Sequence, residues 1–337
     1  MLRKLKSRIR ETWQCVNCHC TIGGINEPID ANLEHGEPIP YDFFIGSIHG
    51  LLFHKAGGAT TRISKHSTYG ITHKEDRWYV FEKIKTRLKP TGRIISFRWE
   101  DDNMKEKKVE IPLLDPEIHQ IDWIDDELFI TDTRNNRLAT YIRNGSKLTL
   151  SREAWPFGRL KNGAQSDNYV HLNSIHRGSD NKIRLLLHNQ TIKTKKKSEL
   201  AILTEELECN ERISLDANSG HNIIFTKETE LTCDSFGSRL IRNRSVFITL
   251  DRYLRGLALN DSSLLIGGSQ VAIGLKRGSP NSVGKIFHLN LFNQGSQSLL
   301  SELHLKGYGN IYEVRIISNR DLSMSNFTKG SKNEKTA

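Results

Sequence analysis

Long apolar runs are missing from this sequence of 337 residues. Its longest apolar stretches, such as "SLLIG" at 263–267, fall far short of the roughly 18 residues that a membrane-spanning helix needs. The N-terminal stretch "MLRKLKSRIRETWQ" is basic, but the apolar core of a secretory signal does not follow it. Without a membrane or secretion signal, the chain is expected to be cytoplasmic.

Cysteine is also scarce, with five residues at positions 15, 18, 20, 209 and 233. An odd count with three cysteines crowded into "CVNCHC" at 15–20 does not make a disulfide framework. This stretch has three interpretations: a haem attachment site, a zinc site, or ordinary or redox-sensitive thiols. Covalent haem attachment takes place outside the reducing cytosol, and a zinc site normally has a second ligand pair, which is missing here. Cys15, Cys18 and Cys20 remain candidate metal ligands.

Several catalytic and nucleotide-binding templates are absent from the sequence. It contains no G-x-G-x-x-G opening a helix, no P-loop, no G-x-S-x-G elbow and no H-E-x-x-H. A paired carboxylate set for general acid and base catalysis is not apparent either. Any chemistry must therefore come from residues that the fold brings together.

Positive charge is abundant, with a formal net charge of +10 and basic clusters at 3–10, 193–197 and 329–335. Leu2, Leu5, Ile9 and Trp13 recur at helical spacing among basic residues, which predicts a basic amphipathic helix. Such an arm could dock on an acidic protein or an anionic membrane surface, although clusters of this kind are more often solvated loops. No recognised nucleic-acid motif accompanies the charge, so nucleic acid is not an expected partner.

A repeat organises the middle of the chain. Six similar segments each carry an apolar residue at the third position, followed by a polar turn. These anchor residues are Ile71, Ile121, Ile175, Ile224, Leu257 and Ile311, with separations of 50, 54, 49, 33 and 54 residues. About four strand patterns fit each unit, and the short unit still fits four strands with tight turns.

Four-stranded units repeated around an axis are typical of a β-propeller. The sixth unit has room for only one strand at its anchor, and residues 41–64 supply the missing strands of the same blade. The sequence therefore predicts an all-β, six-bladed β-propeller that is closed by joining N- and C-terminal strands. A five-bladed ring with extra terminal strands is the alternative. The expected divisions are a short basic N-terminal extension at 1–40, the propeller at 41–322 and a disordered tail at 323–337.

Two blades share a more specific motif, "ITDTRNNRL" at 130–138 and "TCDSFGSRL" at 232–240. Asp132 then corresponds to Asp234, and Arg137 to Arg239. This motif resembles the repeat of NHL propellers and is similar to gluconolactonase-type six-bladed propellers. The resemblance implies that the buried aspartate and the following arginine hydrogen-bond the strand turns, a structural role.

Three phrases, "YVHLNSI", "SGHNIIF" and "YLRGLA", look like those of an uncharacterised bacterial branch of six-bladed propellers, a domain of unknown function. The resemblance covers residues 41–322 and implies a fold rather than an activity. Gluconolactonase-type enzymes hold a divalent cation with Glu, Asp and Asn side chains at the channel mouth. This sequence has no clear equivalent of that acidic set.

Residues at the starts of inner strands converge on the central channel of a propeller. Two positions before the anchors stand Tyr69, His119, Asn173, Asn222, Arg255 and Gly309, and His66, His171 and His221 lie close by. We predict His119, His171 and His221 as catalytic residues or as ligands of a divalent metal, while the sequence leaves the cofactor itself unknown. Tyr69, Asn173, Asn222 and Arg255 are predicted to bind the ligand. The histidines could equally form a polar collar that holds water.

Two functions remain open at this point. In the first, the channel binds a small anionic molecule with a carboxylate, phosphate or sulfate group, or acts on it as a metal-assisted enzyme, with Arg255 holding the anion. In the second, the chain is a non-catalytic interaction propeller that docks a protein partner through its basic loops.

Overall fold

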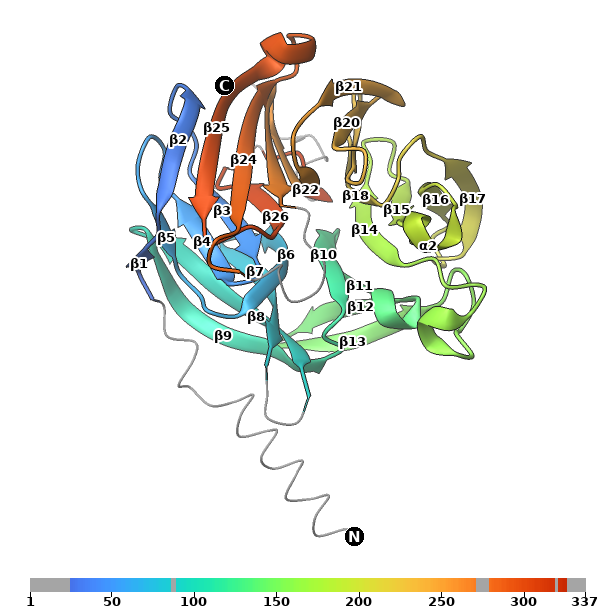
Figure 1. Cartoon of the computed structure of the whole chain (residues 1–337). Helices are drawn as coiled ribbons and strands as arrows, with labels where there is room; N and C mark the ends of the chain where they lie inside the picture. The colour runs from blue at the N-terminus through green and yellow to red at the C-terminus, as the bar shows by residue number, and fades with distance from the viewer. Residues whose placement is uncertain (1–24, 86–88, 271–278, 319–320, 326–337) are drawn as a thin grey trace, which may run out of the picture.

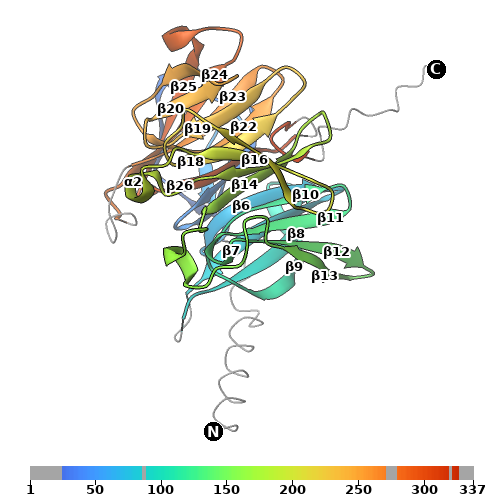
Figure 2. The ribbon, with the colours of Figure 1, turned by 90° about the vertical axis from the view of Figure 1, so that its right-hand side faces the viewer.

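In the part of the chain that the structure describes, 26 strands form six antiparallel sheets arranged as the blades of a propeller around a central axis (Figure 1). The computed structural model describes residues 25–85, 89–270, 279–318 and 321–325. Figure 2, turned by 90°, shows the blades from the side. None of the helices in these ranges is long and apolar enough to cross a membrane. The predicted six-bladed, all-β fold is confirmed.

The strands follow the predicted order, with four consecutive strands in most blades. Blade 1 contains β26 (Ile311–Ile316), β3 (Phe43–Ser47), β4 (Gly50–His54), β5 (Thr60–Arg62) and β1 (Glu27–Pro28). Blade 2 contains β6 (Ser67–Lys74), β7 (Arg77–Ile84), β8 (Thr91–Glu100) and β9 (Asn103–Leu114). Blade 3 contains β10 (Ile118–Ile124), β11 (Glu127–Asp132), β12 (Arg137–Asn144) and β13 (Lys147–Ala154).

The other three blades repeat this arrangement. Blade 4 contains β14 (Leu172–Arg177), β15 (Ile183–Leu187), β16 (Glu199–Leu203) and β17 (Cys209–Ser214). Blade 5, the short unit, contains β18 (Gly220–Phe225), β19 (Glu230–Asp234), β20 (Arg239–Arg242) and β21 (Ser245–Thr249). Blade 6 contains β22 (Tyr253–Asn260), β23 (Ser263–Ser269), β24 (Val283–Asn290), β25 (Leu299–Lys306) and β2 (Ala31–Gly36). The short helices are α2 (Thr191–Thr194), η2 (Thr133–Asn135), η3 (Gly163–Gln165) and η5 (Gly295–Ser298).

Both ends of the chain close the ring, as predicted. The C-terminal strand β26 is the innermost strand of blade 1 and pairs with β3 from the N-terminal part. The expected boundary at residue 40 is wrong, however, because β1 pairs with β5 and β2 pairs with β25. These two strands lie outside the fourth strands of blades 1 and 6, where they cover open sheet edges. The propeller therefore begins near residue 27.

The six anchor residues lie on the six inner strands, and every one of them is fully buried, at 0% exposure. They pack in the apolar layers between adjacent blades, for example Ile311 with Leu265 and Val314. β-Branched and leucine side chains at these positions suit a strand that is covered on both faces. Burial of this apolar surface is the main favourable contribution to the stability of the ring.

A β-bulge interrupts every inner strand shortly before or at the anchor. The pairing register shifts between Thr68 and Ile71 in β6, and equivalent shifts occur in β10, β14, β18, β22 and β26. Bulges turn side chains away from the regular alternation and are common next to functional sites. In β22 the bulge residue is Gly256, with φ +78° and no space for a Cβ, which would lie 2.8 Å from the backbone nitrogen of Val314.

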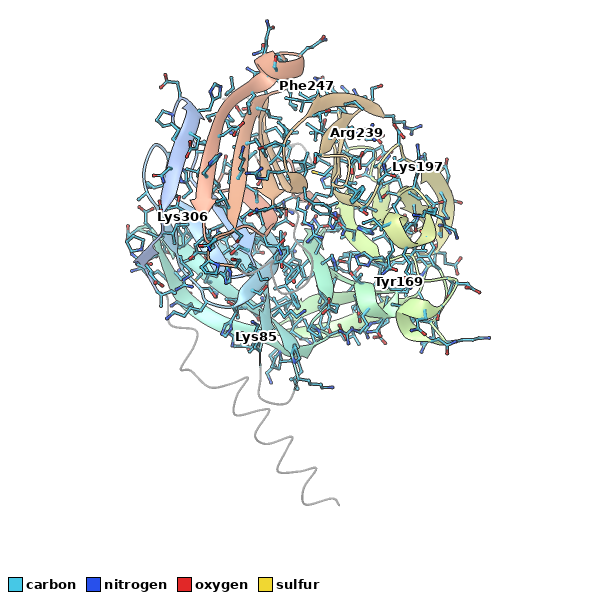
Figure 3. The ribbon with its side chains drawn as sticks, in the orientation of Figure 1. Lys85, Tyr169, Lys197, Arg239, Phe247 and Lys306 are labelled. Carbon is cyan, nitrogen blue, oxygen red and sulfur yellow. The ribbon has the colours of Figure 1, made fainter. Side chains whose placement is uncertain are left out.

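The repeated Asp and Arg pair holds a strand turn in two blades. Asp132 and Asp234 are fully buried. The Nε of Arg137 donates to Asp132 at 2.9 Å, and the Nε of Arg239 donates to Asp234 at 2.7 Å (Arg239 is labelled in Figure 3). Asp234 also accepts from the backbone N–H of Gly237 at 3.0 Å. The structural role that the NHL resemblance implied is confirmed.

The C-terminal residues 321–325 lie across the far end of the channel. The N–H of Leu322 donates to Leu259 O at 2.7 Å in blade 6, and Ser325 Oγ donates to Asp122 Oδ2 at 2.5 Å in blade 3. Met324 is fully buried in the core between blades 1 and 2. The expected disordered tail therefore does not begin at residue 323, because this segment is packed and hydrogen-bonded at least to Ser325. Residues 326–337 lie outside the described ranges.

Replacing Ser325 with alanine should weaken this closure. The buried Asp122 carboxylate would lose the hydroxyl donor to Oδ2, while Thr72 would still donate to Oδ1. We expect a loss of about 1–2 kcal/mol in the free energy of unfolding, measured by chemical denaturation. Ser296→Ala, at an exposed position in η5, is the matched control. An equal effect of the two substitutions on the free energy of unfolding would contradict a stabilising hydrogen bond from Ser325 to Asp122.

Candidate functional site

The starts of the inner strands place side chains on the axis at one face of the propeller, which we call the ring face. Tyr69, His119 and Asn173 lie within the bulges of β6, β10 and β14, where the register skips two residues. In β18 and β22 the bulge follows His221 and Arg255 directly. The fold thus brings together the predicted residues because all six inner strands carry the same irregularity.

Side chains of the bulges also hydrogen-bond the next inner strand. Gln120 Oε1 accepts from the N–H of Ile175 at 2.6 Å, and Ser174 Oγ accepts from the N–H of Asn222 at 2.8 Å. Asn222 Oδ1 accepts in turn from the N–H of Gly256 at 2.7 Å. These bonds satisfy backbone groups that the bulges release from the sheets.

A closed circle of eight side chains surrounds the axis, and we call it the channel ring. Its members, in order, are Tyr69, His119, His171, His188, His221, Tyr253, Arg255 and Tyr312. Five of them were predicted from the sequence. His66 is not a member, and it lies instead beside the buried pair of Glu82 and Arg93.

Four imidazoles form one half of the channel ring. Ring centroids lie 4.7 Å apart for His119 and His171, 4.5 Å for His171 and His188, and 5.0 Å for His188 and His221. Each Nδ1 is already hydrogen-bonded to a neighbouring residue of the protein. The imidazoles therefore present their Nε2 atoms as the remaining polar groups.

Arg255 and three tyrosines form the other half. Tyr69 stacks on Tyr312 with a centroid distance of 4.0 Å and an angle of 11°. The guanidinium carbon of Arg255 lies 5.0 Å from the centroid of Tyr253 and 5.6 Å from that of Tyr312. Cation–π contacts of this kind hold the charge in place without neutralising it. In the described ranges, no carboxylate forms an ion pair with Arg255, and its Nε has no hydrogen-bond partner.

The imidazoles are neutral at physiological pH. Burial, with a smaller contribution from Arg255, lowers the pKa of His119 to about 3. Burial also holds the pKa values of His171, His188 and His221 well below 6.5, and the neighbouring histidines and Arg255 add to the effect. Arg255 is therefore the one formal charge in the channel ring.

The predicted metal site does not fit this arrangement. Across the described ranges, no three His, Cys, Asp or Glu side chains are placed to hold a metal ion. The cavity that the channel ring lines contains no Asp or Glu side chain, and Arg255 would repel a cation beside it. His119, His171 and His221 are grouped as predicted, but as packed rings rather than as ligands of one ion. Cys15, Cys18 and Cys20 lie outside the described residues.

The predicted ligand-binding residues divide into two kinds. Tyr69, Asn173 and Arg255 line the central cavity with polar groups that face it. Asn222 lines it too, but its Oδ1 binds Gly256 and its Nδ2 donates to Glu313 at 3.1 Å. The amide of Asn222 therefore joins neighbouring blades.

Sequence reasoning missed three members of the channel ring. His188 follows the second strand of blade 4, outside the inner-strand positions that we compared. It reaches the ring because loops after second strands lie on the same face as the starts of inner strands. Tyr312 lies one residue after its anchor, so the fixed offset selected Gly309 instead. Tyr253 lies two residues before Arg255 in the same phrase "YLRGLA", which was the available signal.

A larger groove opens beside the channel ring in blade 4, with a volume of about 700 Å³. Residues 164–170 form one wall, and residues next to α2 form the other. The hydroxyl of Tyr169, in this groove, lies 3.0 Å from Nδ1 of His171; Figure 3 labels Tyr169 and Lys197 in this region. Lys193, Lys196 and Arg212 make the groove basic.

Comparison with solved structures shows the same kind of fold. One chain in the structure of a nidogen/laminin complex aligns with a TM-score of 0.57 and 10% identity, covering 83% of this chain and 99% of its own length. A candidate 6-phosphogluconolactonase from Bacteroides fragilis aligns with a TM-score of 0.52 and 8% identity, covering 82% and 98%. The shared feature is the propeller fold. No family model and no curated protein matches the chain by sequence.

Proposed function

We propose that this propeller binds a small anionic molecule at the channel ring, with Arg255 as the group that holds the acid. The observation that carries the proposal is an arginine at the channel mouth that has no acidic partner in the described ranges and lies against Tyr253 and Tyr312. A guanidinium offers two parallel donors to a carboxylate, phosphate or sulfate. The surrounding imidazoles are neutral, so they do not compete with Arg255 for the anion.

Binding is better supported than acid and base catalysis. A general base works best with a pKa near the working pH, whereas the pKa of His119 is about 3. Bound anions favour protonation of nearby imidazoles, so the histidines could gain basicity only once the site is filled. The catalytic roles of His119, His171 and His221 stay predictions. The name of the Bacteroides fragilis protein, a candidate 6-phosphogluconolactonase, is compatible with a phosphorylated small molecule.

Arg255→Ala tests the proposal directly. Inorganic phosphate, sulfate and acetate would be titrated into the wild-type protein and the variant by isothermal calorimetry. We expect the affinity for the anion that binds most tightly to fall by about 10- to 100-fold, since hydrogen bonds to charged groups contribute about 1.5–3 kcal/mol. The melting temperature without anion should not fall, because Arg255 makes no ion pair or hydrogen bond within the described ranges that the substitution would break.

Arg244→Ala is the matched control, because Arg244 lies in the exposed turn between β20 and β21, with 61% of its side chain exposed. Arg255→Lys should retain part of the affinity, since lysine keeps the charge but not the paired donors. Equal affinity of wild-type and Arg255→Ala proteins for all three anions would refute the proposed site.

The groove in blade 4 supports a second candidate function, docking of an acidic segment of a partner protein. Lys193 and Lys196 line it and form no ion pair in the described ranges, whereas Arg212 pairs with Glu199. One chain of similar fold belongs to a protein complex. Reversal of charge at both lysines should abolish such docking while leaving binding of phosphate at Arg255 unchanged.

A further inference from the structure

Three residues that line the cavity beside the channel ring each carry a buried polar atom without a hydrogen-bond partner in the described ranges. These atoms are Nδ2 of Asn173, Nε2 of His221 and Nε of Arg255. Asn173 is 3% exposed and His221 is 4% exposed. The cavity measures about 10 Å³ for the centre of a water molecule, which is room for roughly one oxygen atom.

The hydrogen-bond partners of His221 fix which of its nitrogens carries the proton. Nδ1 lies 2.9 Å from the carbonyl oxygen of Ser219, which can only accept. Nδ1 also lies 2.8 Å from Ser235 Oγ, whose own hydrogen is donated to Leu254 O at 2.6 Å. Nδ1 is therefore protonated. Because the low pKa keeps the ring neutral, Nε2 carries a lone pair and accepts.

The orientation of the Asn173 amide is fixed in the same way. Ser174 Oγ accepts from the N–H of Asn222, so its hydroxyl hydrogen is free to donate to Asn173 Oδ1 at 2.7 Å. The oxygen of this amide is thus occupied, and its NH₂ group is the part without a partner in the described ranges. Arg255 Nε is a donor at any physiological pH. The cavity therefore presents two donors and one acceptor.

His119 adds a second acceptor at the cavity wall. Its Nδ1 lies 2.8 Å from Thr133 Oγ1, and that hydroxyl donates to Leu172 O at 2.6 Å. The proton of the neutral His119 ring is therefore on Nδ1, which leaves a lone pair on Nε2. The unpartnered lone pair of His221 Nε2 therefore calls for a group that can donate a hydrogen bond.

We propose that the oxygen bound in this cavity is a hydroxyl group and that the anion recognised at Arg255 is a 2-hydroxy acid. A hydroxyl can accept from Asn173 and Arg255 and donate to His221, whereas an ionised carboxylate has no hydrogen to donate. Arg255 supplies Nε to the cavity, and its terminal nitrogens remain for the acid. A 2-hydroxy acid carries the two groups on adjacent carbons, the closest spacing at which one guanidinium can contact both. This inference rests on the proposed anion binding at Arg255.

A pair of probes that differ only in the hydroxyl tests the inference in the wild-type protein. Lactate and propionate, and then malate and succinate, would be titrated by calorimetry under the same conditions. We expect each hydroxy acid to bind at least about tenfold more tightly than its deoxy partner, because the deoxy acid leaves Nε2 of His221 without a partner. A water molecule in the cavity of the free protein would be displaced by the hydroxyl.

His221→Asn separates hydroxyl recognition from anion binding. The asparagine amide can still donate to Ser219 O, but it lacks the Nε2 acceptor. We expect lactate affinity to fall to the level of propionate and propionate affinity to stay within about twofold. His288→Asn is the matched control, because His288 is buried in β24 and its Nε2 also lacks a partner in the described ranges.

The outcomes are distinguishable. Tight binding of hydroxy acids that the His221→Asn substitution removes supports the inference. Equal binding of lactate and propionate overturns the hydroxyl requirement but leaves anion binding at Arg255 standing. Failure of all four acids and of inorganic phosphate to bind overturns both proposals. If His221→Asn does not fold, the comparison of hydroxy and deoxy acids in the wild-type protein still decides whether the site requires a hydroxyl group.

Discussion

Acidification from neutral pH to about pH 5 should lower the free energy of unfolding steeply. The described ranges contain nine histidines whose pKa burial lowers. The pKa falls to about 4 for His54, His73 and His288 and to about 3 for His119 and His176, and it is also lowered for His66, His171, His188 and His221. These side chains are neutral in the folded protein and regain a pKa near 6.5 when the chain unfolds.

The direction in which stability changes with pH follows from proton linkage. Below pH 6.5 the unfolded chain takes up protons that the folded chain does not, so stability is complete above this pH and is lost as the pH falls toward the folded pKa values. Buried acids act in the opposite direction, because burial raises the pKa of Asp122 to about 6 and that of Glu313 to about 8. Their contribution is present at low pH and is lost as the pH rises toward 8. Stability should therefore be greatest between about pH 6 and 7.

Chemical denaturation at a series of pH values, with a fixed ionic strength, measures this profile. The nine histidines outnumber the buried acids with raised pKa values, so the acid limb should be the steeper one. His54→Gln, away from the channel ring, should reduce the slope below pH 6.5, since it removes one of the groups. A profile that is flat between pH 7 and about pH 5 would contradict neutral, buried imidazoles in the native protein.

Asp234→Ala should destabilise the propeller by about 3 kcal/mol without affecting anion binding. The carboxylate is fully buried and binds Arg239 through Nε at 2.7 Å and Nη2 at 2.5 Å. It also holds the N–H groups of Asn218 and Gly237 at 2.8 and 3.0 Å. Removal leaves the two N–H groups without this acceptor, although Nη2 of Arg239 still donates to Asp216 O at 3.1 Å. Breaking a buried pair costs about 3–5 kcal/mol. We expect a destabilisation at the lower end of this range because the side chain of Arg239 is 25% exposed.

Urea unfolding of the Asp234→Ala variant measures the loss in free energy of unfolding, and calorimetry with phosphate measures its anion affinity. Asp216→Ala is the matched control, because Asp216 also contacts Arg239, at 3.8 Å, but its side chain is 54% exposed. That substitution should change stability by less than about 1 kcal/mol. A loss of anion affinity in Asp234→Ala, with little change in stability, would contradict the structural role assigned to this motif.

The fold followed from the sequence because its signal is local and repeated. Four of the five anchor spacings are near fifty residues, and the first five anchors are each followed by three further strand patterns. This repetition leaves few ways to bury both faces of every sheet. The motif shared by Asp132 and Asp234 also identified a structural turn correctly. The ends of the propeller were placed less well, because β2 and the segment around Met324 have no repeat and pair with distant strands.

Part of the channel ring was also visible in the sequence. Tyr69, His119 and Arg255 share one offset from their anchors, so the repeat alone places them around the axis. His188 and Tyr312 break that offset, and only the closed ring brings them beside His171 and Tyr69.

The sequence by itself determined an all-β propeller of repeated four-stranded units and a polar channel mouth with an arginine, and it favoured six blades closed by the two ends of the chain over five. These properties depend on hydrophobic periodicity and on residue types at fixed offsets. The tertiary structure alone decided that the histidines are buried, neutral and packed on one another, and that Asn173, His221 and Arg255 meet in one small cavity. Protonation states and free hydrogen-bonding groups depend on which neighbours occupy each nitrogen, and those neighbours come from blades far apart in the chain.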